Sequence, residues 1–212
     1  MKNPKITKSP FAKRIICAIA LLFCTQSLFA QNYAQELADF RKNYKADFLK
    51  DDHSPLKEED LAYLDFYPPN ESLKVKCEFE AIESSDTFEL PTSSGKTKTY
   101  MVFGQLVFKI KAKSYRLNVY RSLALMKNPL YKDYLFIPFR DKTNGKSTYG
   151  AGRYLDLRMK ELGDEIYLDF NKAYNPYCAY SLGYSCPIPP QENTLPLKIK
   201  AGEKKYKKEL DH

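Results

Sequence analysis

A group of polar and aromatic side chains in the C-terminal half of the chain has residue types suited to binding a small polar ligand. These residues lie within or at the ends of three consecutive predicted strands, and consecutive strands are usually neighbours in a sheet. Tyrosine offers an apolar ring with a polar tip, and the chain has 17 tyrosines and no tryptophan. We therefore expect one converged site: Arg140, Asp141, Tyr149, Arg153, Asp169, Asn171, Tyr174 and Asn175.

Arg153 is the centre of this predicted site, because a guanidinium is a planar fork that fits a carboxylate. We expect Arg153 either to form an ion pair with Asp169 or to bind an acidic ligand. A scaffold role stays open, since buried Arg, Asp and Asn side chains often satisfy the backbone of an ordered loop. The sequence alone leaves both roles standing.

The carboxylates of this group also allow an enzyme, namely a hydrolase that needs no histidine. Asp169 with Asp141 or Glu192 would supply the acid and base for an envelope or polymer substrate, provided that one of them has a raised pKa. The chain has two histidines, His53 and His212, and neither stands in a motif. A Ser-His-Asp triad, a Cys-His dyad and a multi-histidine zinc site are therefore not supported.

The sequence predicts no metal and no cofactor. Asp169, Asn171 and Asn175 carry oxygen ligands, but these are short of the roughly six to eight that calcium takes. No P-loop, dinucleotide fingerprint or nucleophile elbow occurs. Gly150 and Gly152 follow a turn into a predicted strand, so we expect them to allow a bulge or a close backbone approach.

The segment from Asp169 to Pro190 is predicted to be a long, ordered loop, because its prolines remove backbone donors and fix φ. Cys178 and Cys186 lie eight residues apart around a Leu-Gly turn, which predicts a disulfide in an oxidising compartment. The alternative, a reactive Cys178 thiol, lacks a nearby histidine to lower its pKa. Cys77 alternates with apolar residues and is predicted to be a buried, free thiol.

Residues 1–30 have the pattern of a secretory signal peptide: five basic residues, an apolar run and a small residue, Ala30, at the cleavage position. The apolar run is short for a spanning helix, which needs about 20 residues. Lipid attachment at Cys24 is disfavoured by the bulky Phe23 before it. We expect a protein exported after cleavage near Ala30, periplasmic or secreted, with no stable membrane insertion.

Removal of this peptide changes the charge balance. The whole chain has a net charge of +8, but residues 1–30 hold five basic and no acidic residues, which leaves 29 basic and 26 acidic residues and a net charge of +3. The remaining excess lies mainly in the last residues, where we expect a basic flexible tail at 205–212. The sequence predicts no nucleic-acid partner and does not indicate an oligomeric state.

Apolar periodicity changes from helical to strand-like along the chain. A helical stripe is predicted from Tyr33 to Phe48, and a second short helix has Ser54 as its N-cap and Pro55 as its first residue. From Ser72 the period is two, as in a half-solvated antiparallel strand. Further strands are predicted at residues 87–90, 98–112, 115–121, 134–140, 147–157, 165–171 and 195–200, with a bend or bulge at Gly104.

These elements predict a single domain over residues 31–204. Its class is α+β, mainly β: an antiparallel curled sheet, barrel-like or a sandwich, with two N-terminal helices and a long ordered C-terminal loop.

Three stretches carry a resemblance to a known family. They are FRDKTNGKSTYGAGRYLDL at 139–157, DFNKAYNPYCAYSLGYSCPIPP at 169–190 and PIPPQENTLPLKIKAGEK at 187–204. Together they resemble the bacterial family called domain of unknown function 1684, over about Phe40 to Lys204. The resemblance implies a mainly β fold and assigns no catalytic residue.

Overall fold

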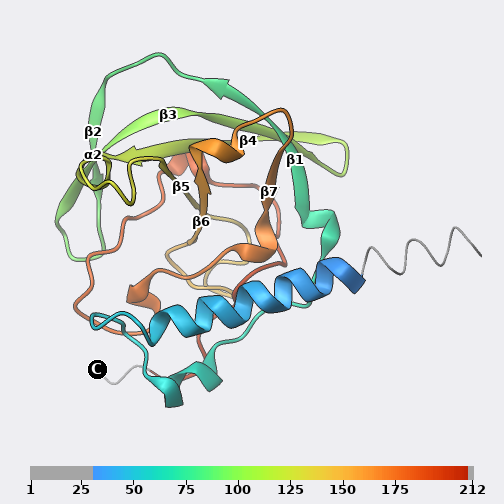
Figure 1. Ribbon diagram of the computed structural model, residues 1–212, viewed down its shortest axis with the longest axis vertical. Coiled ribbons are helices and arrows are strands. Elements are labelled where there is room, and N and C mark those ends of the chain that lie inside the picture. Colours follow the sequence, from blue (N-terminus) through green and yellow to red (C-terminus); the bar gives the residue numbers. More distant parts are fainter. Residues whose placement is uncertain (1–30, 210–212) are drawn as a thin grey trace, which may run out of the picture.

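The computed structural model describes residues 31–209, so the expected signal peptide and the last residues of the tail lie outside the described part. The predicted N-terminal helix is confirmed and is described over residues 31–48. Its apolar stripe faces the protein, with Tyr33, Leu37 and Phe48 buried. Figure 1 shows this helix, in blue, crossing one end of the curled sheet.

The second predicted helix begins later than expected and is a 3₁₀ helix, η1 (Glu58–Tyr63). Ser54 does not cap it, because the Ser54 hydroxyl is used in a local turn, accepting from the amide of Leu56 at 3.2 Å. The Asp60 carboxylate instead accepts from the amide of Lys57 at 3.0 Å and closes the first turn. Leu56 is thereby buried before the helix begins.

Seven antiparallel strands form one curled, half-barrel sheet, which confirms the mainly β, α+β class (Figure 1). The order across the sheet is β6-β5-β4-β3-β1-β7, with β2 paired to β3. The bounds are β1 (Lys74–Ala81), β2 (Thr87–Pro91), β3 (Thr97–Ile110), β4 (Lys113–Ser122), β5 (Tyr134–Phe139), β6 (Arg153–Arg158) and β7 (Ile166–Asp169).

The predicted irregularity at Gly104 is confirmed as a register shift between Val102 and Gly104 in the β3–β4 pair. A Cβ at Gly104 would lie 2.4 Å from the Phe79 ring and 2.7 Å from the Glu80 carbonyl oxygen. Only glycine allows β1 to approach β3 this closely.

The remaining helices are single turns. They are α2 (Leu123–Met126), η2 (Glu71–Leu73), η3 (Met159–Glu161), η4 (Phe170–Lys172), η5 (Tyr177–Ala179) and η6 (Gln191–Asn193). Of these, α2 and η3 connect strands, η2 precedes β1, and η4, η5 and η6 follow β7. No helix within residues 31–209 is long and apolar enough to cross a bilayer.

Two predicted strand segments are not strands. Residues 147–152 form a compact turn, in which the Thr143 carbonyl accepts from the amides of Lys146 and Ser147 at 3.0 and 3.1 Å. Gly152, at φ +115°, then turns the chain into β6, and a Cβ there would meet the Phe139 carbonyl oxygen at 2.8 Å. The close approach expected for this glycine is thus confirmed.

Residues 195–200 also lack strand structure, although the chain makes one parallel bridge from Thr194 to Arg140. Pro196 has no amide hydrogen to donate to a ladder. The segment is nevertheless buried, and Leu195, Ile199 and Ala201 join the main core with residues of β1 and β3 to β7. It fills the sheet's apolar face without extending the sheet.

The predicted boundary at Lys204 lies within packed chain. Tyr206 is buried against Tyr180, with ring centroids 5.2 Å apart, and Lys208 pairs with Asp60 at 2.7 Å. The flexible tail expected from residue 205 is therefore wrong for residues 205–208, because an aromatic side chain within the charged run has a pocket to fill.

Candidate functional site

Arg153 is completely buried, and the two terminal nitrogens of its guanidinium bind other parts of the chain, whereas Nε has no hydrogen-bond partner within the described residues. It forms an ion pair with Asp141 at 2.7 Å, with no exposed area on either side chain. It also donates to the carbonyls of Ile199 at 3.0 Å, Glu203 at 3.1 Å and Ala201. The predicted ion pair of Arg153 with Asp169 is wrong. Arg153 instead donates hydrogen bonds to backbone carbonyls of the C-terminal segment, which within residues 31–209 has no neighbouring strand to donate them.

Asp169 lies at the end of β7 and fastens the N-terminal helix. Its carboxylate accepts from the Tyr33 hydroxyl at 3.0 and 3.1 Å and from the Asn171 amide at 3.0 Å. Asn171 in turn exchanges two hydrogen bonds with the backbone of Asn70, both 2.8 Å. Burial and the nearby Asp169 raise the pKa of Tyr33, so its hydroxyl stays a donor.

The other predicted residues surround the base of the long loop. Asn175 donates from its amide to Glu203 at 3.0 Å and from its side chain to the Lys204 carbonyl at 2.8 Å. Arg140 donates to the Ala151 carbonyl at 3.3 Å, and Tyr149 lies near the disulfide loop. Most of the predicted group therefore holds loops together, and only Tyr174 lines the aromatic cleft described next.

A cleft of about 730 Å³ opens between the N-terminal helix and strands β5 and β6. Its lining is mainly aromatic and is made of Phe40, Asn43, Tyr44, Asp47, Phe48, Leu125, Tyr131, Tyr134, Leu155, Asp156, Lys172, Tyr174 and Tyr177. A volume of this size falls in the range of small-molecule sites, about 300–1,000 Å³.

Asp156 is one of two carboxylates in the lining of this aromatic cleft, with Asp47, and the sequence-based prediction missed it. It accepts hydrogen bonds from the hydroxyls of Tyr134 at 2.6 Å and Tyr174 at 2.9 Å. The side chain reaches solvent through the cleft, yet the surrounding protein desolvates it and raises its pKa to about 6. The two tyrosine donors oppose that rise.

The sheet register places these three groups together. Asp156 lies opposite Phe136 in the β5–β6 pair, next to the pair of Tyr134 with Arg158. Tyr174 arrives from the long loop through a two-hydrogen-bond bridge to Tyr154, at 2.9 and 3.1 Å. Asp156 lies within a predicted strand, and no motif in the sequence marks it as a site residue.

Of the three charged side chains that line the cleft, two form ion pairs and one does not. Lys172 contacts Glu36 at 3.2 Å, and Asp47 contacts Lys50 at 2.7 Å. Within residues 31–209, Asp156 has no basic side chain within 4.0 Å. The unbalanced charge in the cleft is therefore the negative charge of Asp156.

A second cavity of about 370 Å³ adjoins the aromatic cleft and shares Leu125, Tyr134, Tyr174 and Tyr177 with it. The long loop supplies its far wall through Tyr184, Ser185, Cys186 and Pro187. This loop is closed by the predicted Cys178–Cys186 disulfide, with Cα atoms 6.3 Å apart. The predicted free thiol of Cys77 is buried.

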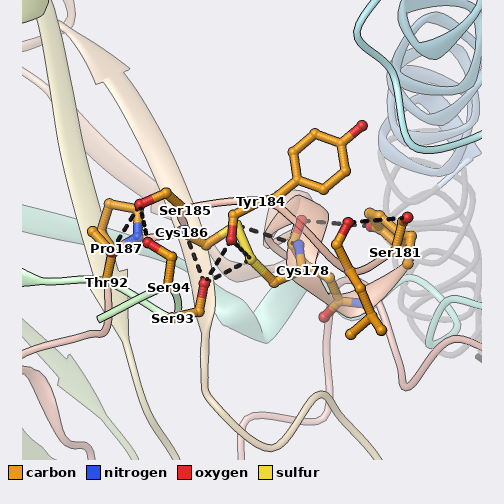
Figure 2. Close-up of a disulfide and its surroundings, with 12 residues drawn as sticks. Thr92, Ser93, Ser94, Cys178, Ser181, Tyr184, Ser185, Cys186 and Pro187 are labelled. Carbon is orange, nitrogen blue, oxygen red and sulfur yellow. Dashed lines mark hydrogen bonds between the residues drawn. A yellow bond between two sulfur atoms is a disulfide. The ribbon is translucent and has the colours of Figure 1, made fainter. Parts of the chain in front are cut away.

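The disulfide loop is seated on the β2–β3 turn, as Figure 2 shows. Ser93 donates from its amide to the Cys186 carbonyl at 2.9 Å, and its hydroxyl accepts from the Cys186 amide at 3.1 Å. The hydroxyls of Thr92 and Ser94 both reach the Ser185 hydroxyl at 2.8 Å. One wall of the cavity pair is thus positioned by residues about 90 positions away in sequence.

Glu203 is a second carboxylate that the sequence did not single out. It is fully buried and accepts from the hydroxyl of Tyr180 at 2.7 Å, from that of Tyr44 at 3.0 Å and from the Asn175 amide at 3.0 Å. Burial raises its pKa to about 7. Glu203 lies within the polar stretch Ala-Gly-Glu-Lys-Lys, which is typical of a protein surface. No signal in the sequence therefore distinguishes Glu203 from the charged residues next to it.

The carboxylates proposed for hydrolysis do not form an open pair. Asp141 is enclosed with Arg153, and Asp169 is buried beneath Tyr33. Glu192 is exposed on η6. Within the described part of the chain, no group of three or more His, Cys, Asp and Glu side chains could hold a metal ion.

Comparisons with known proteins agree with this fold. The family model described as "Protein of unknown function (DUF1684)" matches residues 59–204. An uncharacterised protein of Haloarcula marismortui, solved by solution NMR, is 33% identical, with a TM-score of 0.63 over 82% of this chain and 95% of that one. No curated protein matches the chain.

Proposed function

The chain belongs to the DUF1684 family, a name that assigns no activity, and from that premise we propose that it is an exported, β-rich binding module for a small polar ligand. The observation that carries the proposal is the aromatic cleft with Asp156 at its wall. A mainly apolar lining with one or a few polar groups is typical of small-molecule sites. The export part rests on the signal-peptide pattern of residues 1–30.

The location of the proposed site differs from the one expected from sequence. Asp141 and Arg153 neutralise each other out of contact with solvent, and Asp169 is occupied by Tyr33 and Asn171. Asp156 and Tyr174, in contrast, have ring or carboxylate surface in the cleft. What supports a binding module over a paired-carboxylate hydrolase is that Asp141 is held by an arginine.

Blocking the cleft tests the proposal. Leu125 lines both cavities, so Leu125→Trp should fill the space they share, while Leu130→Trp adds the same bulk at a side chain that is 75% exposed. The exported protein is purified from its native host, and the small molecules it retains are identified by mass spectrometry. We expect the wild-type protein and the Leu130→Trp variant to retain a small molecule that the Leu125→Trp variant does not retain.

Two results would count against the proposal. The first is a wild-type protein whose small-molecule spectrum equals that of Leu125→Trp. The second is a molecule retained equally by all three proteins, which would place binding outside the cleft. N-terminal sequencing of the same preparation tests export, with Gln31 as the expected first residue.

A further inference from the structure

The chemistry of the aromatic cleft narrows the class of ligand, if the proposed function holds. Asp156 is its one carboxylate without a basic partner within the described residues, and both of its oxygens are held by tyrosine hydroxyls. Asp156 is exposed to solvent in the cleft, so a ligand that fills the cleft would cover it, and removal of a carboxylate from bulk water is costly unless a counter-charge compensates it. A cationic ligand supplies that counter-charge.

The rest of the lining fits a cation through ring faces. Seven aromatic residues surround the space: Phe40, Tyr44, Phe48, Tyr131, Tyr134, Tyr174 and Tyr177. Cations are attracted to the faces of such rings, and the attraction grows as the cation is desolvated. The same rings already attract cationic side chains in this protein: Lys172 lies 5.4 Å from the Phe40 ring centroid and Arg158 lies 5.7 Å from that of Tyr131.

The hydrogen-bond acceptors of the lining are spread around its wall. They are the Asn43 side chain, the tyrosine hydroxyls and two carboxylates, of which Asp156 already accepts from tyrosines and Asp47 is paired with Lys50. A primary ammonium would need three of these acceptors to converge on it. An alkylated ammonium has few or no donors and is attracted by the ring faces themselves.

From this combination we infer that the aromatic cleft binds an alkylated ammonium group, with Asp156 as its counter-charge and the tyrosine and phenylalanine rings as its walls. Tyr134 and Tyr174 are positioning residues, because their hydroxyls hold the carboxylate towards the cleft. This inference rests on the proposed function and specifies its ligand.

Choline and its isostere, 3,3-dimethylbutan-1-ol, have nearly the same shape, but only choline is charged. Comparison of their affinities therefore distinguishes the contribution of the positive charge from that of shape. We expect calorimetry at pH 7.5 to show choline binding to wild type about tenfold more tightly than the isostere, as ring and carboxylate attraction together imply. Asp156→Asn should reduce this preference to about equal affinity, whereas Asp164→Asn, an exposed carboxylate outside the cleft, should keep it. Thermal melts establish that both variants are folded.

The preference should also fall at pH 5, because the pKa of Asp156 is about 6 and the carboxylate is then mostly protonated. The groups that act on this titration are Tyr134 on β5, Tyr174 on the loop, Arg158 at the end of β6 and Glu161 on η3. Asp47 and Lys172 line the same cleft and are paired with Lys50 and Glu36.

The outcomes separate the two proposals. Equal binding of choline and the isostere would overturn the cation inference and leave a cleft that binds by shape. No binding of choline would also overturn it, while a different molecule lost from Leu125→Trp would still support the binding module. A choline preference that survives Asp156→Asn would refute the role of the carboxylate.

Discussion

Arg153 and Asp141 form an ion pair at 2.7 Å that is sealed from solvent, and the two terminal nitrogens of the guanidinium also donate to backbone carbonyls of residues 199–203. The pair therefore connects β6 to the C-terminal segment that completes the core. A buried ion pair of this kind is costly to break, since removal of one partner leaves the other charge unpaired.

Arg153→Ala should lower the free energy of unfolding by about 3 to 5 kcal/mol, because it leaves Asp141 charged and buried and frees three carbonyls. Arg116→Ala is the control: Arg116 pairs with Glu80 at 3.0 Å on the surface, and its loss should cost less than about 1 kcal/mol. Urea unfolding of both variants measures the difference. A cost for Arg153→Ala as small as the control's would contradict the scaffold role.

Tyr134→Phe should raise the pKa of Asp156 above about 6, because it removes a hydroxyl donor at 2.6 Å from the ionised carboxylate. The expected rise is roughly one pH unit, the size of a charge-assisted hydrogen bond. Tyr131→Phe is the matched control, since Tyr131 lines the same cleft and makes no hydrogen bond to Asp156 within the described residues. Carboxyl carbon shifts followed by NMR across pH 4–8 give both values, and an unchanged pKa in Tyr134→Phe would disprove the coupling.

Glu203 should make the folded state less stable as pH rises. Its pKa is raised by burial from 4.5 to about 7, so the folded state binds the proton more tightly than the unfolded state. The stability is present below pH 4.5 and is lost as pH rises through 7, by roughly 3 kcal/mol in total. Asp156 contributes in the same direction, so the informative quantity is the difference between wild type and a variant.

Glu203→Gln removes this titration and keeps the shape of the side chain. Its free energy of unfolding relative to wild type should increase between pH 4 and pH 8, while Glu83→Gln, at an exposed position, should show a constant difference. Chemical denaturation at several pH values measures both. Parallel pH profiles for Glu203→Gln and wild type would show that Glu203 does not titrate in this range.

Reduction of the Cys178–Cys186 disulfide should lower stability by about 2 to 3 kcal/mol, the value for a loop of this length. Peptide mapping under non-reducing conditions should find this pair and a free Cys77. Burial raises the pKa of Cys77 to about 12, so iodoacetamide should label it only after unfolding. A peptide that links Cys77 to either loop cysteine, or rapid labelling in the folded protein, would refute the assignment.

Local patterns in the sequence predicted much of the fold. The stripe at Tyr33, Leu37 and Phe48, the two-residue alternation of β1 and the irregularity at Gly104 all depend on contacts between near neighbours or on the size of one side chain. The pairing of Cys178 with Cys186 is similarly local, because the two lie eight residues apart. Such features are determined by spacing alone.

The partners of the buried polar groups were decided by the tertiary structure. The sequence predicts an ion pair of Arg153 with Asp169. The β5–β6 register instead sets Arg153 opposite Phe139 and so near Asp141, and the path of residues 199–203 supplies the carbonyls that accept its other hydrogen bonds. The same holds for Asp156, which the sequence did not single out. It became part of a cleft because the β5–β6 register sets it beside Tyr134 and a loop bridge brings Tyr174 to it, and register and bridge depend on contacts far apart in the chain.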